Sequence, residues 1–174
     1  MAGLNISKVK FLVVEDNPFM KDLLRQILRT LGVTQIVEAS NGAEGYELFT
    51  QMSPDIVLLD WQMEPMDGLE LTKIIRAKES PNRYVPIIMI TAFSEIARVT
   101  LARDVGVNEI LVKPIAATSL FTRIRAVIER PRLFVEAETY FGPDRRRRAD
   151  PNYKGEDRRV TAKRDVAFVG ESAA

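Results

Sequence analysis

Neither cysteine nor histidine occurs in the 174-residue sequence. Without cysteine the chain has no disulfide framework, no thiolate metal site and no cysteine nucleophile. Without histidine it has no Ser-His-Asp triad, no imidazole zinc site and no histidine general base. Any chemistry must therefore use carboxylates, lysine, hydroxyl groups or a bound metal ion.

Long apolar runs are also missing, since no segment approaches the roughly 18 residues that a membrane-spanning helix needs. The N-terminus lacks the basic, apolar and small-residue regions of a signal peptide, so we expect a cytoplasmic protein without a transmembrane segment. A hydrophobic fraction of 46% is enough for a folded core. The length fits one α/β domain of about 120 to 130 residues with an appendage.

The charge balance divides the chain at Pro131. Up to Arg130 the sequence has 15 Lys/Arg and 16 Asp/Glu, and from Pro131 onward it has 10 and 8. Seven of the later basic residues lie between Gly142 and Arg159. We expect a folded domain over residues 8–130 and a mostly irregular, flexible, arginine-rich tail over residues 131–174.

Residues 8–130 alternate between short apolar strands and amphipathic helices. The strands are expected at 11–14, 35–39, 56–59, 86–90 and 109–112, and the helices at 18–31, 42–51, 69–78, 94–105 and around 120–128. Five such units predict a doubly wound, five-stranded parallel sheet with helices on both faces. In that architecture the working site lies at the carboxyl ends of the strands.

Polar residues follow the expected strands at the positions where they would meet. They are Glu15, Asp16, Asp60, Thr91 and Lys113. Crowded carboxylates raise each other's proton affinity unless a cation lies among them, and Mg²⁺ prefers oxygen ligands of this kind. Lys113 and Thr91 suit an anion with tetrahedral oxygens, most simply a phosphoryl group. Asp60, at the end of the central strand, is the best-placed acceptor, and its attack on phosphorus would give an acyl phosphate.

Two other observations bear on this chemistry. Neither GxxxxGK[ST] nor GxGxxG occurs, so a nucleotide is not the expected phosphoryl source. Each residue also has a structural alternative, because Asp16 or Thr91 could cap a helix and Lys113 could pair with a surface acid.

Five motifs in residues 8–130 resemble the receiver domain of two-component response regulators, which has the flavodoxin-like, CheY-like (βα)5 fold. They are Val13-Val14-Glu15-Asp16-Asn17-Pro18, Leu58-Leu59-Asp60, Met66-Asp67-Gly68, Ile90-Thr91-Ala92 and Val112-Lys113-Pro114. They occur in the family's order and spacing and cover about three quarters of the chain.

The resemblance implies a role for each matching residue. Glu15, Asp16, Asp60 and the backbone carbonyl of Gln62 would bind Mg²⁺, and Asp60 would accept a phosphoryl group from a sensor histidine kinase or histidine phosphotransferase. Thr91 would be the switch hydroxyl and Lys113 the phosphate-binding lysine, preceding a cis peptide bond to Pro114. Such a protein is a signalling switch with autocatalytic phosphotransfer rather than an enzyme with turnover, and it acts through protein partners.

The sequence departs from the family pattern at three places. The loop after Asp60 reads Met63-Glu64-Pro65-Met66-Asp67-Gly68, which moves the usual proline by one position and adds a carboxylate. Ile110 occupies the switch position that usually holds Tyr or Phe. Gln62 and Phe93 occupy the positions that influence how long the phosphoryl group is retained.

The tail contains an internal repeat. Tyr140–Arg146 and Tyr153–Arg159 share the pattern Y-x-G-x-D-R-R, thirteen residues apart. Arginine can grip the edge of guanine and pair with phosphate, and aspartate can accept hydrogen bonds from guanine. The tail resembles the arginine-rich tails of CheY-like cyclic di-GMP effectors that act at the flagellar motor. By that resemblance the ligand-binding residues are Asp144, Arg145, Arg146, Asp157, Arg158 and Arg159.

Alternatives remain open for both parts of the chain. The tail could instead bind a protein partner or anions without specificity, and it is too short for a DNA-binding domain of about 60 residues. The whole chain could be a docking module that works without phosphorylation and is controlled by a ligand or partner of the tail. A haloacid-dehalogenase-like hydrolase is disfavoured, because Glu15-Asp16-Asn17-Pro18-Phe19 does not match that family's DxDx[TV].

Overall fold

The computed structural model describes residues 4–144 and 160–162 of the chain. Its main body is a five-stranded parallel sheet in the order β2-β1-β3-β4-β5. The strands are β1 (Lys10–Val14), β2 (Gln35–Ala39), β3 (Ile56–Asp60), β4 (Ile87–Thr91) and β5 (Glu109–Val112). Strands β3 and β4 are buried along their whole length, as expected for central strands that helices cover on both sides.

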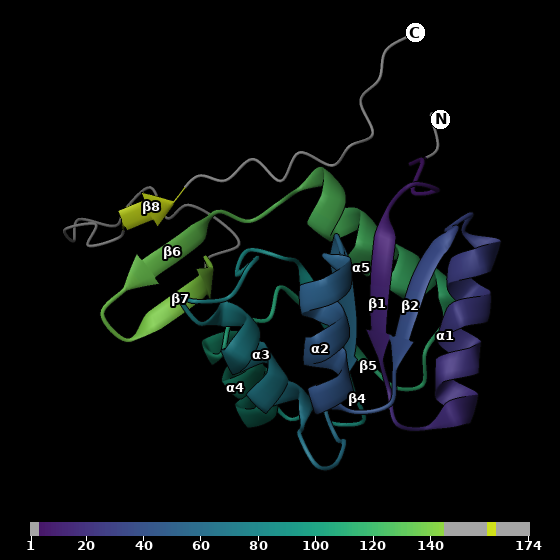
Figure 1. Cartoon of the computed structure of the whole chain (residues 1–174), viewed down its shortest axis with the longest axis horizontal. Helices are drawn as coiled ribbons and strands as arrows, with labels where there is room; N and C mark the ends of the chain where they lie inside the picture. Colours follow the sequence, from purple (N-terminus) through teal and green to yellow (C-terminus); the bar gives the residue numbers. More distant parts are fainter. Residues whose placement is uncertain (1–3, 145–159, 163–174) are drawn as a thin grey trace, which may run out of the picture.

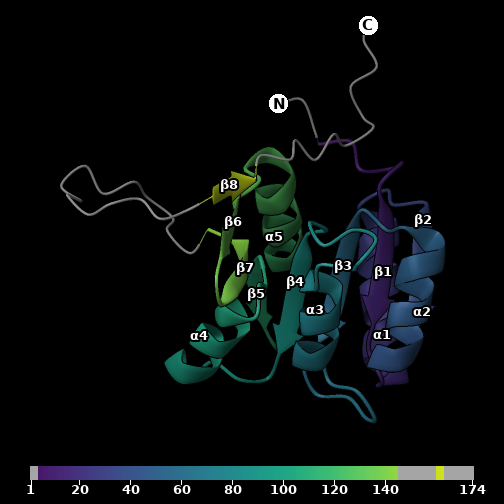
Figure 2. The same ribbon diagram turned by 60° about the vertical axis from the view of Figure 1, so that its left-hand side comes forward.

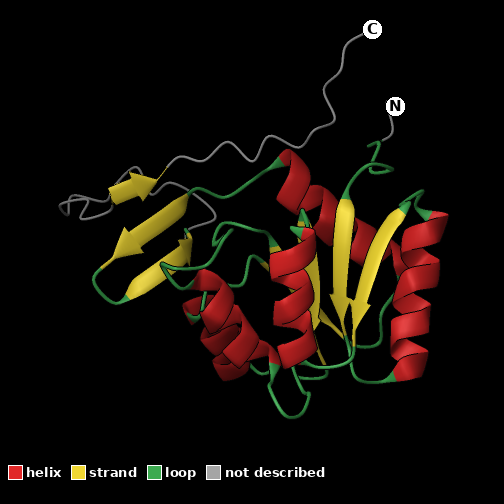
Figure 3. Cartoon of the chain, in the orientation of Figure 1, coloured by secondary structure: helices red, strands yellow, loops and turns green. Residues whose placement is uncertain are grey.

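Five helices cover the two faces of this sheet (Figure 1; Figure 3). They are α1 (Pro18–Thr30), α2 (Gly42–Met52), α3 (Gly68–Arg76), α4 (Ile96–Asp104) and α5 (Ala117–Glu129). Side chains of α1 and α5 share one hydrophobic cluster with alternate residues of β1 and β3. Side chains of α2, α3 and α4 share the cluster on the opposite face. The predicted doubly wound fold is confirmed.

Three helices begin at side-chain caps that the sequence encodes locally. The Asn17 side chain accepts hydrogen bonds from the backbone N–H groups of Phe19 and Met20, with Pro18 at the first helical position. Asn41 caps α2 in the same way through the N–H of Glu44. Asp67 and Glu70 form a reciprocal capping box at the start of α3. These caps set where the chain turns after each strand, and therefore what lies at the strand ends.

A second, smaller sheet follows α5, where irregular structure was expected. Its strands are β6 (Phe134–Ala137), β7 (Tyr140–Pro143) and β8 (Val160–Ala162), in the antiparallel order β7-β6-β8. Figures 1 and 2 show this sheet beside the main body, separate from its five strands. Regular structure therefore continues across the predicted domain boundary at Pro131.

Aromatic rings attach the β6–β7 hairpin to the main body. The rings of Phe134 and Phe141 each lie 5.2 Å from the ring of Tyr84, in edge-to-face contact. The Arg83 guanidinium lies 3.2 Å from the centre of the Phe141 ring, and that of Arg76 lies 5.1 Å from the centre of the Phe134 ring. These ring contacts therefore stabilise the packing of residues 134–143 against the main body.

Arg76 is the buried cation beneath this hairpin. Its guanidinium donates hydrogen bonds to the carbonyls of Gly106 and Arg83 and to the Asn108 side chain, at 2.7 to 3.0 Å. Burial lowers the pKa of Arg76 to about 9, which leaves it charged at neutral pH. Ion pairs of Arg83 with Glu136 and of Arg132 with Glu109 add to the attachment. All these contacts lie at the end of the sheet where β4 and β5 begin.

Within residues 4–144 and 160–162, no helix is long and apolar enough to cross a membrane. Elements differ from the sequence prediction mainly at helix ends. Helix α4 begins at Ile96 rather than Ser94, and α3 ends at Arg76 because the next residue, Ala77, is extended.

Candidate functional site

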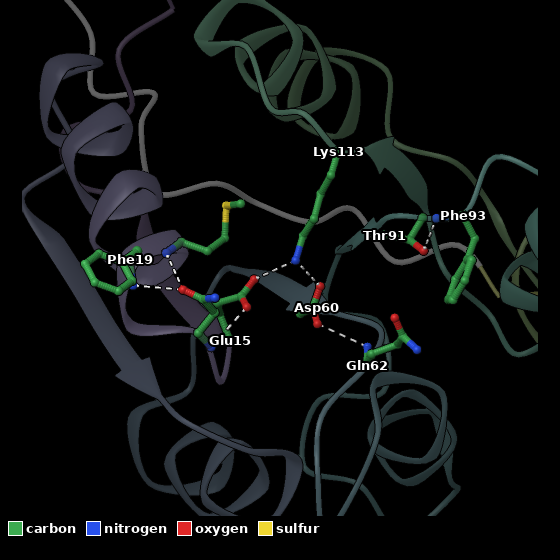
Figure 4. A network of polar contacts seen from close by, with 9 residues as sticks. Glu15, Phe19, Asp60, Gln62, Thr91, Phe93 and Lys113 are labelled. Carbon is green, nitrogen blue, oxygen red and sulfur yellow. Dashed lines mark hydrogen bonds and ion pairs between the residues drawn. The ribbon is translucent and has the colours of Figure 1, made fainter.

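The carboxyl ends of the parallel strands bring four of the predicted residues together (Figure 4). Asp60 and Thr91 are the last residues of β3 and β4, and Glu15 and Lys113 directly follow β1 and β5. The register pairs Asp60 with Ile90 and Thr91 with Val112, so neighbouring strands end at the same level. The arrangement is the one expected from the sequence.

Lys113 lies between the two buried carboxylates. Its Nζ is 2.7 Å from Oδ1 of Asp60 and 3.3 Å from Oε2 of Glu15. The Asp60 and Glu15 side chains are 6% and 1% exposed. Backbone N–H groups complete the site, because Gln62 donates to Asp60 at 3.1 Å and Asn17 donates to Glu15 at 3.2 Å. Lys113 and the Gln62 backbone N–H therefore hold the Asp60 carboxylate in position.

The two carboxylates are crowded despite the lysine. Burial raises the pKa of Asp60, and the charge of Asp16 raises it further, while Lys113 lowers it. Burial and the charge of Asp60 also raise the pKa of Glu15. Burial lowers the pKa of Lys113, but the hydrogen bond and charge of Asp60 and the charge of Glu15 outweigh burial and leave it raised. The site thus favours additional positive charge.

Glu15, Asp16 and Asp60 can meet that need with a metal ion. One carboxylate oxygen from each lies within 4.8 Å of the others, and Asp16 is exposed to solvent. Three carboxylates, one of them exposed to solvent, fit a hard divalent cation that retains water ligands, as Mg²⁺ does. The Gln62 carbonyl stays a predicted fourth ligand, since the contact observed at Gln62 is through its N–H.

Thr91 has the position expected of a switch hydroxyl. It is 1% exposed, and its Oγ1 accepts a hydrogen bond from the Phe93 backbone N–H at 3.0 Å. A hydroxyl both accepts and donates, so this contact uses only the accepting side of the Thr91 hydroxyl. Ile110 is partly buried against the hydrophobic cluster that contains Trp61, and its role in switching stays a prediction.

Comparison with known proteins decides the family. Residues 11–125 match the response regulator receiver domain. The chain belongs to the response regulator receiver family. It is 34% identical to chemotaxis protein CheY-3 of Vibrio cholerae over 130 residues, which cover 75% of this chain and 99% of that protein. It is 37% identical to a CheY homologue of Campylobacter jejuni over 121 residues, which cover 69% and 92%.

Solved structures agree with this assignment. The receiver is similar to the CheX-CheY-BeF3-Mg complex from Borrelia burgdorferi, with a TM-score of 0.65, 27% identity, and 72% and 96% of the two chains covered. It is equally similar to a putative response regulator from Chloroflexus aurantiacus, with a TM-score of 0.65, 27% identity, and 70% and 98% covered. The match to the family ends at residue 125, before the predicted tail.

Two features of the receiver's loops bear on the sequence departures. Glu64 lines an open cavity of about 530 Å³, together with Asp16 and Arg98. The extra carboxylate therefore belongs to the same cavity as Asp16. The peptide bonds preceding Pro65 and Pro114 are both cis.

Trp61 and Arg98 lie beside the predicted site residues but were not predicted from the sequence. Trp61 directly follows Asp60 and is 6% exposed, so its position beside the acceptor was a usable signal. The Arg98 guanidinium lies over the rings of Phe93 and Trp61. No sequence signal identifies Arg98, because its contact depends on how α4 lies against the β4–α4 loop.

The predicted tail site is described only at its first residue. The Asp144 backbone N–H donates to the Leu133 carbonyl at 2.7 Å, which closes the β6–β7 hairpin. Tyr140–Pro143, the start of the first repeat, is strand β7. The other predicted ligand residues lie outside the described residues: Arg145, Arg146, Asp157, Arg158 and Arg159.

Proposed function

We propose that this chain is a single-domain response regulator that accepts a phosphoryl group on Asp60 and signals through a protein partner. The donor is the phosphohistidine of a sensor histidine kinase or histidine phosphotransferase. The observation that carries the proposal is the contact of Lys113 with both Asp60 and Glu15, 2.7 and 3.3 Å away, at the edge where Thr91 also ends its strand. The chain is a switch and not an enzyme with turnover.

The chemistry follows from these side chains. An Asp60 carboxylate oxygen forms a bond to phosphorus as the bond from phosphorus to the donor's imidazole nitrogen breaks, and that nitrogen keeps the electron pair. Glu15, Asp16 and Asp60 would hold Mg²⁺, which when bound neutralises charge on the transferred oxygens. Lys113 binds a phosphoryl oxygen, and the Thr91 hydroxyl donates a hydrogen bond to the product.

Replacement of the acceptor tests this function. The Asp60→Asn variant should lose labelling by radioactive acetyl phosphate or a phosphorylated kinase, because an amide is not a nucleophile. Asp55→Asn is the matched control, because Asp55 lies just before β3, at the end opposite Asp60. Its side chain accepts a hydrogen bond from the Lys10 backbone N–H. Labelling that persists in Asp60→Asn would refute the assignment of the acceptor.

We also propose a second candidate function, an effector role for the tail, which the repeat Y-x-G-x-D-R-R supports. In this role cyclic di-GMP binds the arginine pairs, and output is set by the tail rather than by Asp60 alone. Ile110 in place of an aromatic residue favours this alternative. Calorimetry should show saturable, micromolar binding that is lost in a chain ending at Asp144. Steep weakening with salt would instead indicate nonspecific anion binding.

A further inference from the structure

Helix α4 has few contacts that fix its position. Of its nine residues, all described, only Ala102 is buried. Its N-cap residue, Glu95, makes no side-chain hydrogen bond to the start of the helix, and Ile96 in its first turn is 85% exposed. The other four helices each have at least three buried residues, so burial opposes the displacement of α4 least.

Arg98 supplies one such contact, toward the phosphoryl site. Its guanidinium carbon lies 3.6 Å from the centre of the Phe93 ring and 5.8 Å from that of Trp61. The two rings are themselves in edge-to-face contact, with centres 6.0 Å apart and planes at 80°. A cation over two aromatic rings is attracted by their negative faces, so the stack ties α4 to the loop after β4.

The rings of Trp61 and Phe93 are connected to the ends of β3 and β4, where Asp60 and Thr91 lie. Trp61 follows Asp60 in the chain, and the Trp61 backbone N–H donates a hydrogen bond to the Ile90 carbonyl of β4. The Phe93 N–H donates to the Thr91 hydroxyl, as Figure 4 shows. Any change in the Thr91 hydroxyl bonding therefore acts on the backbone of Phe93, and the ring of Phe93 carries Arg98.

We propose that Arg98 is a positioning residue that couples the state of Asp60 to α4 through Phe93 and Trp61. This inference rests on the proposed phosphoryl-acceptor function. It gives the receiver a route to α4 that does not need an aromatic side chain at Ile110. Because coupling is reciprocal, a partner that fixes α4 also changes ligand affinity at Asp60 by the same factor.

The test compares binding at Asp60 with the response of α4. Beryllofluoride with Mg²⁺ is the probe, and binding is followed by fluorescence of Trp61, the single tryptophan. The response of α4 is the change in hydrogen exchange of residues 96–104 on binding. The variants are Arg98→Ala, Arg98→Lys and Phe93→Ala, and the control is Arg103→Ala, another exposed arginine of the same helix.

We expect Arg98→Ala and Phe93→Ala to lose the α4 response while beryllofluoride affinity changes by no more than about fivefold, the factor that one exposed cation–π contact supplies. Arg98→Lys should restore part of the response, and Arg103→Ala should behave like the parent chain. A variant that carries both Arg98→Ala and Phe93→Ala should lose no more of the α4 response than either single variant does. An unchanged α4 response in Arg98→Ala overturns the inference alone, whereas absence of binding in the parent chain overturns the proposed function as well.

Discussion

The Asp60 and Glu15 carboxylates share a buried site with Lys113, and this makes the receiver sensitive to protons in two opposite ways. Burial raises the pKa of both groups above the values of 3.8 and 4.5 that they have when exposed. At these two groups the metal-free folded chain therefore binds protons more readily than the unfolded chain. The raised pKa of Lys113 lies above 10.5 and does not enter this acid range.

Lowering the pH through this range should have opposite effects on stability and on metal binding. The contribution of these two groups to the free energy of unfolding of the metal-free chain should increase, because protonation removes the cost of burying their charge in the folded state. Mg²⁺ affinity should decrease in the same range, because the ligands must be deprotonated. Urea unfolding and Trp61 fluorescence titration at a series of pH values measure the two. An Mg²⁺ affinity that is constant down to pH 4.5 would contradict the assignment of Glu15 as a ligand.

Position 68 has no room for a side chain, because its backbone lies against the end of β3. A Cβ atom on Gly68 would lie 2.3 Å from the Asp60 carbonyl oxygen. Gly68→Ala should therefore displace the end of β3, lower the free energy of unfolding by about 1 to 3 kcal/mol and abolish labelling of Asp60. Ser94→Ala, at an exposed position of the β4–α4 loop, is the control. Wild-type labelling of Gly68→Ala would show that this loop moves at no cost to the site.

At the scale of elements, the parallel sheet was predictable and the small antiparallel sheet was not. Continuous apolar runs such as Ile56–Leu59 identify buried strands, and Asn17 and Asn41 mark helix starts by local hydrogen bonding. Because parallel strands end together, the meeting of Glu15, Asp60 and Lys113 follows from their positions alone. The hairpin forms because Phe134 and Phe141 pack on Tyr84 and two arginines, and no local pattern encodes that contact. The same limit explains why Arg98 was missed.

The attachment of the hairpin predicts a sharp contrast between adjacent residues. Phe134 is 5% exposed and lies over Arg76, whereas Leu133 is 49% exposed. Phe134→Ala should lower the free energy of unfolding by about 3 kcal/mol, since it removes a buried ring and opens the site of a buried cation. Leu133→Ala should change it by less than about 0.5 kcal/mol. Equal effects in urea unfolding would mean that the hairpin does not stabilise the receiver.

For the whole molecule, the place where the chain is shortened should matter more than its length. A chain ending at Arg130 loses β6, β7 and β8 and uncovers Tyr84 and Arg76, so it should unfold at lower temperature than the full chain. A chain ending at Asp144 keeps the hairpin and should unfold close to the full chain. Both should still accept a phosphoryl group, because Asp60 lies at the other end of the strands. Thermal unfolding and labelling check this, and equal unfolding temperatures of the two shortened chains would contradict it.

The hairpin packs on Tyr84 and Arg83, just before β4 begins, and Asp60 lies at the opposite end of the sheet, where β3 ends. A protein that covers one end of the sheet leaves the other end accessible. A kinase that reaches Asp60 under the proposed function would therefore leave the hairpin uncovered. The receiver then has two surfaces that can be occupied independently, one at each end of its strands.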